Sequence, residues 1–458
     1  MKQILLCILF LTVLISCDNF LEVGPNTSEL DTELVFKNDI TAIAALEGIY
    51  HELQFKGFAS GNAQSITFLG NTLADDAVEH SISGDSHDFY SNTLRADNST
   101  NYSIWTSAYK QLYNINALLE GIENNIDLSI ETKNRIEGEG KFLRAFIYYY
   151  LVHLYDKVPL VLTTDYQVNQ SMPRTSVDEI YTQIQNDLEE ALGHLPEDYM
   201  RNKGQHIRPT KYAAFTLLAR LALWKEDYTE AVQYANKVID SDKFSLIGLD
   251  AAFKANSAES IWQLIPVVPN TGANEGAVYI LKNNPSSMYT ASSQSLTDDF
   301  LSIWQVDDLR YQNWMGIYTE GEHMYYYPYK YKIKSGGDSE EYSMVLRFAE
   351  LYLIRAEAYA KSGDTHAALD DLNSIRNRAG IPNWSMEDIT NIDQAVLEER
   401  RRELFSEWGH RWLDLKRFGK TDEVLGQKKS TWQQDAKLLP IPEQDILKNP
   451  FLTQNPGY

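Results

Sequence analysis

Apolar residues recur every three or four positions through much of the chain, which is the spacing of helices that bury one face. In the first such stretch, residues 38–53, this face is formed by Ile43, Leu46, Tyr50 and Leu53. Asn38 or Asp39 precedes the face as a candidate N-cap. The same spacing predicts helices over residues 105–119 and 138–156. Asn116 lies on the apolar face of the former and is expected to form buried hydrogen bonds, with a ligand contact as the alternative.

The stretch Val396–Lys420 combines helical spacing with dense charge, since six charged residues fill Glu398–Glu403. It also contains Trp408 and Trp412, and each tryptophan buries on the order of 200 Å² when it packs. This segment therefore packs against a large surface, and its buried charges need partners. Within helical reach, Arg411 has Glu407 and Asp414 as partners. We predict a structural ion-pair network.

A metal site is the alternative for this stretch. Glu407 and His410 have the E-x-x-H spacing of carboxylate-bridged metal sites, which need two such motifs on inward-facing helices. The other copy, Glu320–His323, contains a glycine and lies in a polar stretch. We therefore predict no metal and no cofactor.

Two helical segments repeat one another. Ala219–Ala231 aligns without a gap with Ala356–Ala368, and small alanines let two antiparallel helices approach closely across an Asp-containing turn. This is the pattern of a tetratricopeptide hairpin. We predict a mostly α fold: a tetratricopeptide-like helical repeat scaffold, with hairpins near 212–240 and 347–378, interrupted by large irregular loop insertions.

The insertions are predicted near 55–103 and 266–340, where Gly, Ser, Asn and Asp are frequent and no helical period is sustained. Between them, residues 260–265 form a short apolar run that fits a buried strand or a helical turn. Rings are concentrated in Tyr325–Tyr331. Rings on loops beside polar groups can stack on sugars, although for any single ring packing onto the scaffold is the more common role.

The composition indicates one large body, because no Gly/Ser- or Pro-rich linker divides residues 35–458. A hydrophobic content of 43% is enough for a sizeable core. The formal charge of −23 argues against nucleic-acid binding, which needs a basic surface.

The N-terminus predicts export. Residues 4–15 form an apolar run that fits a signal-peptide core, and Ser16 precedes Cys17 in the manner of a lipobox. We expect a signal peptide over 1–16, acylation of Cys17 and a tether over 17–34. Secretion with Cys17 as a free thiol is the alternative. Cys7 lies in the leader, so the mature chain has no disulfide.

Three motifs carry a resemblance to a known family. They are ERRRELFSEWGHRWLDLKR at 399–417, LPIP at 439–442 with NPFLTQNPGY at 449–458, and GEGKFLRAFIYYYLVHLYDKVPLV at 138–161. Their order and length resemble the SusD/RagB family of outer-membrane nutrient-binding lipoproteins. The acidic start after Cys17 is similar to that of the surface-exposed members.

The resemblance implies a lipid-anchored outer-membrane protein, exposed at the cell surface. It would capture oligosaccharides, or less often peptides, and pass them to a TonB-dependent, SusC-like transporter. The alternative is a lipid-anchored tetratricopeptide adaptor that binds only proteins or peptides in the envelope. As ligand contacts within the two insertions we predict Asp76, Tyr90, Tyr289 and Trp314.

We predict no catalytic activity, because the chain has no G-x-S-x-G elbow, phosphate-binding glycine loop or H-E-x-x-H motif. The acid pairs Asp75–Asp76 and Asp298–Asp299 could serve a glycosidase, whose two carboxylates flank a sugar. Adjacent acids are more commonly helix caps or solvated loop charges.

Overall fold

A computed structural model describes residues 32–286, 292–336 and 340–458. The first half contains α2 (Thr32–Val35), α3 (Asp39–Phe55), α4 (Ile66–Leu73), β1 (Ala77–Glu79), α5 (Asp85–Ser91), α6 (Ser99–Ile122), α7 (Ile130–Tyr155), α8 (Tyr166–Asn169), α9 (Val177–Leu192), α10 (Lys211–Trp224) and α11 (Tyr228–Ile239). The central part contains β2 (Ser260–Leu264), α12 (Asn274–Tyr279), β3 (Gln294–Leu296), α13 (Asp298–Ser302), α14 (Leu309–Trp314), β4 (Met315–Glu320), β5 (His323–Pro328) and β6 (Ser343–Arg347). The last part contains α15 (Phe348–Lys361), α16 (Thr365–Arg378), α17 (Ile392–Leu404), α18 (His410–Arg417), α19 (Thr421–Lys428) and α20 (Glu443–Lys448).

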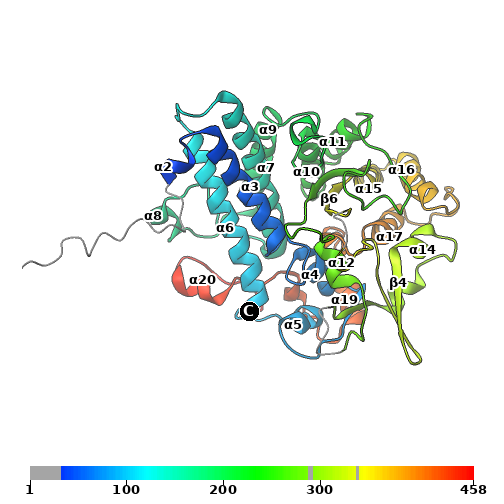
Figure 1. The fold of residues 1–458 in the computed structure, drawn as a ribbon. Helices are drawn as coiled ribbons and strands as arrows, with labels where there is room; N and C mark the ends of the chain where they lie inside the picture. Colours follow the sequence, from blue (N-terminus) through cyan, green and yellow to red (C-terminus); the bar gives the residue numbers. More distant parts are fainter. Residues whose placement is uncertain (1–31, 287–291, 337–339) are drawn as a thin grey trace, which may run out of the picture.

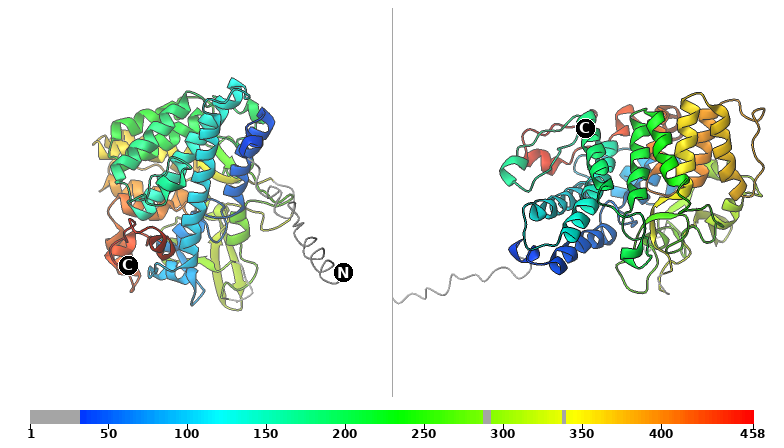
Figure 2. Two further views of the ribbon diagram at one scale, coloured as in Figure 1. Left: turned by 90° about the vertical axis from the view of Figure 1, so that its left-hand side faces the viewer. Right: turned by 90° about the horizontal axis from the view of Figure 1, so that it is seen from above.

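The long helices form a continuous array in which each packs against the next, in the order α6, α7, α9, α10, α11, α15, α16 and α17. In the right-hand view of Figure 2, the green helices of α10 and α11 lie beside the yellow and orange helices of α15 and α16. Three two-stranded antiparallel sheets pair β1 with β3, β2 with β6, and β4 with β5. The mostly α fold is confirmed.

Side-chain caps fix where several helices begin. Asn38 accepts a hydrogen bond from the backbone N–H of Thr41 at the start of α3, as the spacing predicts. Asp227 caps α11 and Asp364 caps α16 in the same way. The helix pairs α10–α11 and α15–α16 thus turn on equivalent aspartates. Their classification as tetratricopeptide repeats stays a prediction.

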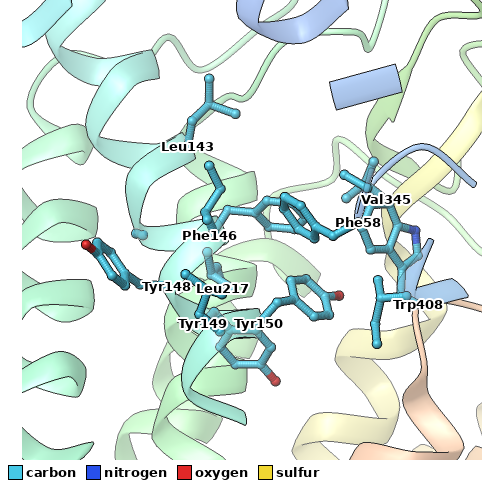
Figure 3. Packing of buried hydrophobic residues seen from close by; sticks show 14 of the residues in the cluster. Phe58, Leu143, Phe146, Tyr148, Tyr149, Tyr150, Leu217, Val345 and Trp408 are labelled. Atoms are coloured by element: carbon cyan, nitrogen blue, oxygen red, sulfur yellow. The ribbon is translucent and has the colours of Figure 1, made fainter. Parts of the chain in front are cut away.

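The main core joins the ring-rich helix α7 to the segment after α17 (Figure 3). The ring centroid of Phe146 lies 5.5 Å from that of Trp408 and 5.1 Å from that of Trp262. The indole N–H of Trp408 donates to the carbonyl of Met344 at 2.6 Å. Trp412 is also fully buried. The tryptophans of Val396–Lys420 therefore dock this segment, as expected from their size.

The predicted ion-pair network exists, but most of its pairs are not the expected ones. Glu403 accepts from Arg347 at 2.6 Å and from Arg310 at 3.1 Å, and also pairs with Arg378. Burial raises the pKa of Glu403, yet these arginines hold that pKa well below its ordinary value. Arg347, on β6, lies 56 residues from Glu403 along the chain. Partners this far apart in the chain cannot be predicted from residues that lie three or four positions apart on one helix.

Glu407 and Arg411 also bind distant partners. Glu407 accepts from Arg347 at 2.8 Å and Arg411 donates to Asp75 at 2.7 Å, so the predicted Glu407–Arg411 and Arg411–Asp414 pairs are wrong. The carboxylate of Glu407 is thus neutralised by cations. Burial and the nearby Arg220 lower the pKa of His410 well below its ordinary value. The E-x-x-H motif therefore faces positive charge.

The two insertions contain more secondary structure than their composition indicates. The helix α4 lies inside the first, and all eight of its residues are buried. With only eight residues, this helix is too short for its apolar positions to establish a sustained helical period in the sequence. The second insertion contains α12, α13, α14 and the hairpin β4–β5. Residues 260–264 form the strand β2, paired with β6, as one of the two alternatives predicted.

Candidate ligand-binding site

Trp314 was expected to contact a ligand, and the structure shows that this prediction is wrong. Its side chain is 0% exposed at the end of α14, packed among Phe253, Phe405 and neighbouring rings. The indole N–H donates to the carbonyl of Leu249 at 3.0 Å. The Lys330 ammonium lies 4.7 Å from its ring centroid. A ring with no accessible face cannot stack on a sugar.

Asp76 is likewise buried, and it lies in an ion-pair cluster rather than at a surface. Its carboxylate accepts from Arg401 at 2.7 Å and is 0% exposed. Asp75 accepts from Arg411, and Asp299 accepts from Arg401 at 2.9 Å. The prediction of Asp76 as a ligand contact is therefore wrong. Of the acids considered for glycoside hydrolysis, Asp75, Asp76 and Asp299 bind arginine instead of flanking an open sugar site.

The pKa values in this cluster follow its geometry. Burial raises the pKa of both adjacent aspartates, and for Asp75 the surrounding Arg411 and Arg401 more than offset this and lower the pKa. For Asp76, burial and the charge of Asp75 win, so its pKa is raised. One guanidinium, that of Arg401, serves both carboxylates. The cluster ties β1 and α13 to α17.

The other predicted residues fare differently. Tyr90 lies half-buried on α5, with the ammonium of Lys429 5.1 Å from its ring centroid, and its role as a ligand contact stays a prediction. Tyr289 and Cys17 lie outside the described residues. Asn116, in contrast, is buried as predicted. Its side chain accepts from Arg144 at 3.0 Å and donates to the carbonyl of Val161 at 3.0 Å.

The hairpin β4–β5 in the second insertion carries a row of aromatic rings. Side chains two residues apart on a strand share a face, so His323, Tyr325 and Tyr327 line one side of β5. Tyr325 is paired across the hairpin with Tyr318, and their centroids lie 6.3 Å apart. Tyr327 is paired with Gly316. The rings therefore follow one another along the hairpin.

Gly316 is needed for this arrangement. A Cβ at Gly316 would lie 2.2 Å from Cζ of Tyr327, so the ring of Tyr327 lies directly over the bare backbone. Beyond it, Tyr329 contacts Tyr327 edge-on at 5.8 Å between centroids. We call the set the ring row; it consists of His80, Tyr318, His323, Tyr325, Tyr327 and Tyr329.

His80 attaches the ring row to the neighbouring sheet β1–β3. It follows β1, and its ring lies edge-on to Tyr325 with centroids 5.4 Å apart. Its Nε2 is 2.8 Å from the hydroxyl of Ser295 on β3. Burial lowers the pKa of His80, so the imidazole is neutral at neutral pH. Ile280, Leu281 and Tyr327 form a small core beneath the row.

The solvent exposure of the rings increases along the ring row towards the tip of the hairpin β4–β5. In Figure 1 this hairpin projects from the body of the protein at the label β4. Tyr327 is buried, Tyr325 and Tyr318 are half-buried, and His323 is exposed. Such rings offer flat apolar faces together with hydroxyl and imidazole edges, which suits a flat amphipathic ligand. The composition of this region pointed to rings, but the alternation in HMYYYP, which selects these particular residues, was missed.

Across the residues that the structure describes, no helix combines the length and apolarity needed to cross a membrane.

Comparison with known proteins finds related family models in both the N-terminal and the C-terminal part of the chain. A family model described as the SusD family matches residues 309–458, and one described as starch-binding associating with outer membrane matches residues 19–223. SusD-like protein P2 of Formosa agariphila is 26% identical, covering 98% of each chain. The starch-binding protein SusD of Bacteroides thetaiotaomicron is 26% identical over 71% of this chain and 73% of that protein.

Solved structures show the same fold. A SusD superfamily protein from Bacteroides vulgatus has a TM-score of 0.78 at 21% identity, covering 92% of this chain and 100% of that one. A laminarin-binding SusD-like protein has a TM-score of 0.75 at 24% identity, with the same coverage. These likenesses establish the architecture of the helical array and its insertions.

Proposed function

Because the chain belongs to the SusD/RagB family, we propose that it is a surface-exposed nutrient-binding lipoprotein that captures oligosaccharides and passes them to a TonB-dependent outer-membrane transporter. Two similar proteins support the ligand class, since one is named as starch-binding and another as laminarin-binding. A description of one matching family places its members at the outer membrane.

The observation that supports this proposal most directly is the ring row. It lies within the second insertion, its outer members Tyr318, Tyr325 and His323 retain accessible surface, and its inner members are fixed by packing. A rigid row of rings binds sugar faces without the entropy cost of ordering a loop. We therefore assign the ligand contacts to the ring row, with Tyr90 and Tyr289 as further members of the same proposal.

Anchoring belongs to the same proposal. Cleavage after Ser16 and acylation of Cys17 would leave residues 17–34 as a tether to the membrane, with residues 35–458 as one ligand-binding domain. An anchor with more than one acyl chain gives stable attachment, because each buried methylene contributes ~0.8 kcal/mol. The protein would bind without catalysis, since Asp75, Asp76 and Asp299 supply their carboxylates to the Arg401 cluster.

Isothermal titration against a panel of neutral oligosaccharides tests the proposal. Tyr325→Ala is expected to weaken binding about two- to tenfold, because an aromatic contact contributes ~0.5–1.5 kcal/mol. Tyr234→Ala, which removes a half-buried ring from α11, is the matched control and should bind as the parent does. Absence of oligosaccharide binding, with recovery of envelope assembly proteins in a pull-down, would instead favour the adaptor.

A further inference from the structure

A second ring-lined depression lies far from the ring row, on the face formed by α6, α8 and α20. Figure 1 shows α8 and α20 flanking α6 at the opposite side of the molecule from the hairpin β4–β5. The depression is a groove of about 570 Å³, within the size range of small-ligand sites. The residues that matter for its chemistry are Trp105, Tyr109, Tyr113, Tyr166, Asn169 and Asp445. We call it the α6–α20 groove.

The floor of the groove is rigid. Trp105 and Tyr109 lie one helical turn apart on α6 with ring centroids 4.8 Å apart. The hydroxyl of Tyr109 donates to the carbonyl of Pro159 at 2.8 Å, which fixes that ring against the loop after α7. Trp105 is 4% exposed and also packs edge-on against Tyr155. The floor is therefore fixed by packing and does not need to be ordered when a ligand binds.

Two tyrosine rings at the rim of the groove are exposed to solvent. Tyr113 on α6 is 52% exposed and Tyr166 on α8 is 73% exposed. Each ring offers an apolar face with a hydroxyl at its edge. Rings of this kind that line one groove can contact the C–H faces of a sugar while their hydroxyls bond to its oxygen atoms.

Asn169 supplies an unsatisfied polar atom at the same place. Its Nδ2 donates to the carbonyl of Thr163 at 2.7 Å, which orients the amide. Its Oδ1 is enclosed and accepts no hydrogen bond from the part of the chain that the structure describes. An enclosed acceptor without a donor costs roughly 1–3 kcal/mol. A ligand hydroxyl that donates to Oδ1 would recover this cost.

The charges at the groove indicate a neutral ligand. Asp445 and Lys448, one turn apart on α20, form an ion pair at 3.5 Å, so the two formal charges that line the groove cancel. The chain as a whole carries −23, which disfavours anionic ligands. A cationic ligand would have to displace Lys448 to reach Asp445. The groove therefore suits a ligand that is neutral, flat and rich in hydroxyl groups, and an uncharged oligosaccharide has these properties.

We propose that the α6–α20 groove is a second carbohydrate-binding site, which holds an uncharged oligosaccharide segment on Tyr113 and Tyr166, above the floor formed by Trp105 and Tyr109, with a hydroxyl donated to Asn169. The proposal rests on the proposed function for its ligand class but not for its location. Two sites on opposite sides of one body allow a long polysaccharide, or two chains of a particle, to be held at once. Binding to polymer then exceeds the affinity of either site alone.

Affinity gel electrophoresis in amylopectin, laminarin, xylan and galactomannan tests the proposal, with retardation as the readout. Tyr166→Ala and Asn169→Ala change exposed or partly exposed positions on a short surface helix, so folding should be unaffected, which circular dichroism checks. On the polymer that retards the parent most, each variant is expected to bind about tenfold more weakly. Tyr325→Ala should retain residual retardation, and Tyr166→Ala with Tyr325→Ala should abolish it.

The two proposals fail in different ways. If Tyr166→Ala and Asn169→Ala migrate as the parent does while Tyr325→Ala loses retardation, the groove proposal is overturned and the proposed function stands. If only the groove variants lose retardation, the groove proposal is supported and the assignment of ligand contacts to the ring row is overturned. A parent protein that no polymer retards overturns both. Val168→Ala, on the same helix but not lining the groove, is the matched control.

Discussion

Gly70 in α4 and Gly409 at the start of α18 meet backbone to backbone. A Cβ built on Gly70 would lie 2.5 Å from Cα of Gly409, and Gly409 itself has a φ of +68°. Neither position therefore accepts a side chain. The contact joins the buried helix of the first insertion to the C-terminal motif over 399–417, more than three hundred residues away. Glycine at both positions is a packing requirement of this fold.

Gly70→Ala should therefore destabilise the protein by about 2–3 kcal/mol, because the extra methyl must displace backbone rather than a flexible side chain. Urea unfolding followed by tryptophan fluorescence measures the effect. Gly48→Ala is the control: it lies on the exposed side of α3, with nothing within 4 Å of the added methyl, and should stabilise by up to ~1 kcal/mol. Equal stability of the two variants would contradict the backbone contact.

Glu403 is the carboxylate on which three arginines converge, so Glu403→Gln should cost about 3–5 kcal/mol. The loss arises because Arg310, Arg347 and Arg378 stay buried with one negative charge fewer. Thermal unfolding at neutral pH measures it. Glu398→Gln, on the same helix but with a 41% exposed side chain 3.5 Å from Arg402, should cost no more than about 1 kcal/mol. Similar losses in both variants would show that Glu403 is not central.

The sequence predicted several long helices from the spacing of their apolar residues, and it predicted an ion-pair network from the density of charge beside two tryptophans in Val396–Lys420. Helix α3 and its cap at Asn38 follow from spacing alone. The partners of Glu403 could not be predicted, since Arg310 and Arg347 lie on α14 and β6, far along the chain. Which element lies next to which is decided by packing over the whole molecule.

The candidate site was predicted at the level of the region but not of the residue. The second insertion does contain a row of rings, yet Trp314 is buried, whereas the smaller Tyr325 retains accessible surface. Size favours burial, so a tryptophan in a ring-rich stretch is a poor choice for an exposed contact. The alternation of the hairpin, rather than the composition, selects the accessible faces.

Glu275 should make stability depend on pH near neutrality. Burial, with smaller effects from Glu407 and Glu341, raises its pKa from 4.5 to about 7, and its Oε2 has no partner in the described part of the chain. Because the folded pKa is the higher one, the contribution of Glu275 to stability is greatest below about pH 4.5 and is lost as the pH rises through 7. The expected loss is on the order of 3 kcal/mol.

Comparison with Glu275→Gln isolates this effect from other titrating groups. The free energy of unfolding of the parent, minus that of Glu275→Gln, should fall between about pH 4.5 and pH 7, where the carboxyl is ionised in the unfolded chain but still protonated in the folded one, and should level off above pH 7. Urea unfolding at closely spaced pH values measures this difference. Glu197→Gln, whose side chain is 68% exposed, should give a difference that is flat over the same range. A flat difference for Glu275→Gln as well would refute the raised pKa.

The proposed surface location depends on acylation of Cys17, and Cys17→Ser tests this proposal in cells. The parent should incorporate labelled palmitate and fractionate with the outer membrane, since the acyl chains of the anchor contribute ~0.8 kcal/mol per buried methylene. Cys17→Ser should lose the label and leave the membrane fraction. Cys7→Ser changes the one other cysteine, in the predicted leader, and should behave as the parent does. An unlabelled parent protein, recovered in the medium with a free thiol at Cys17, would instead favour ordinary secretion.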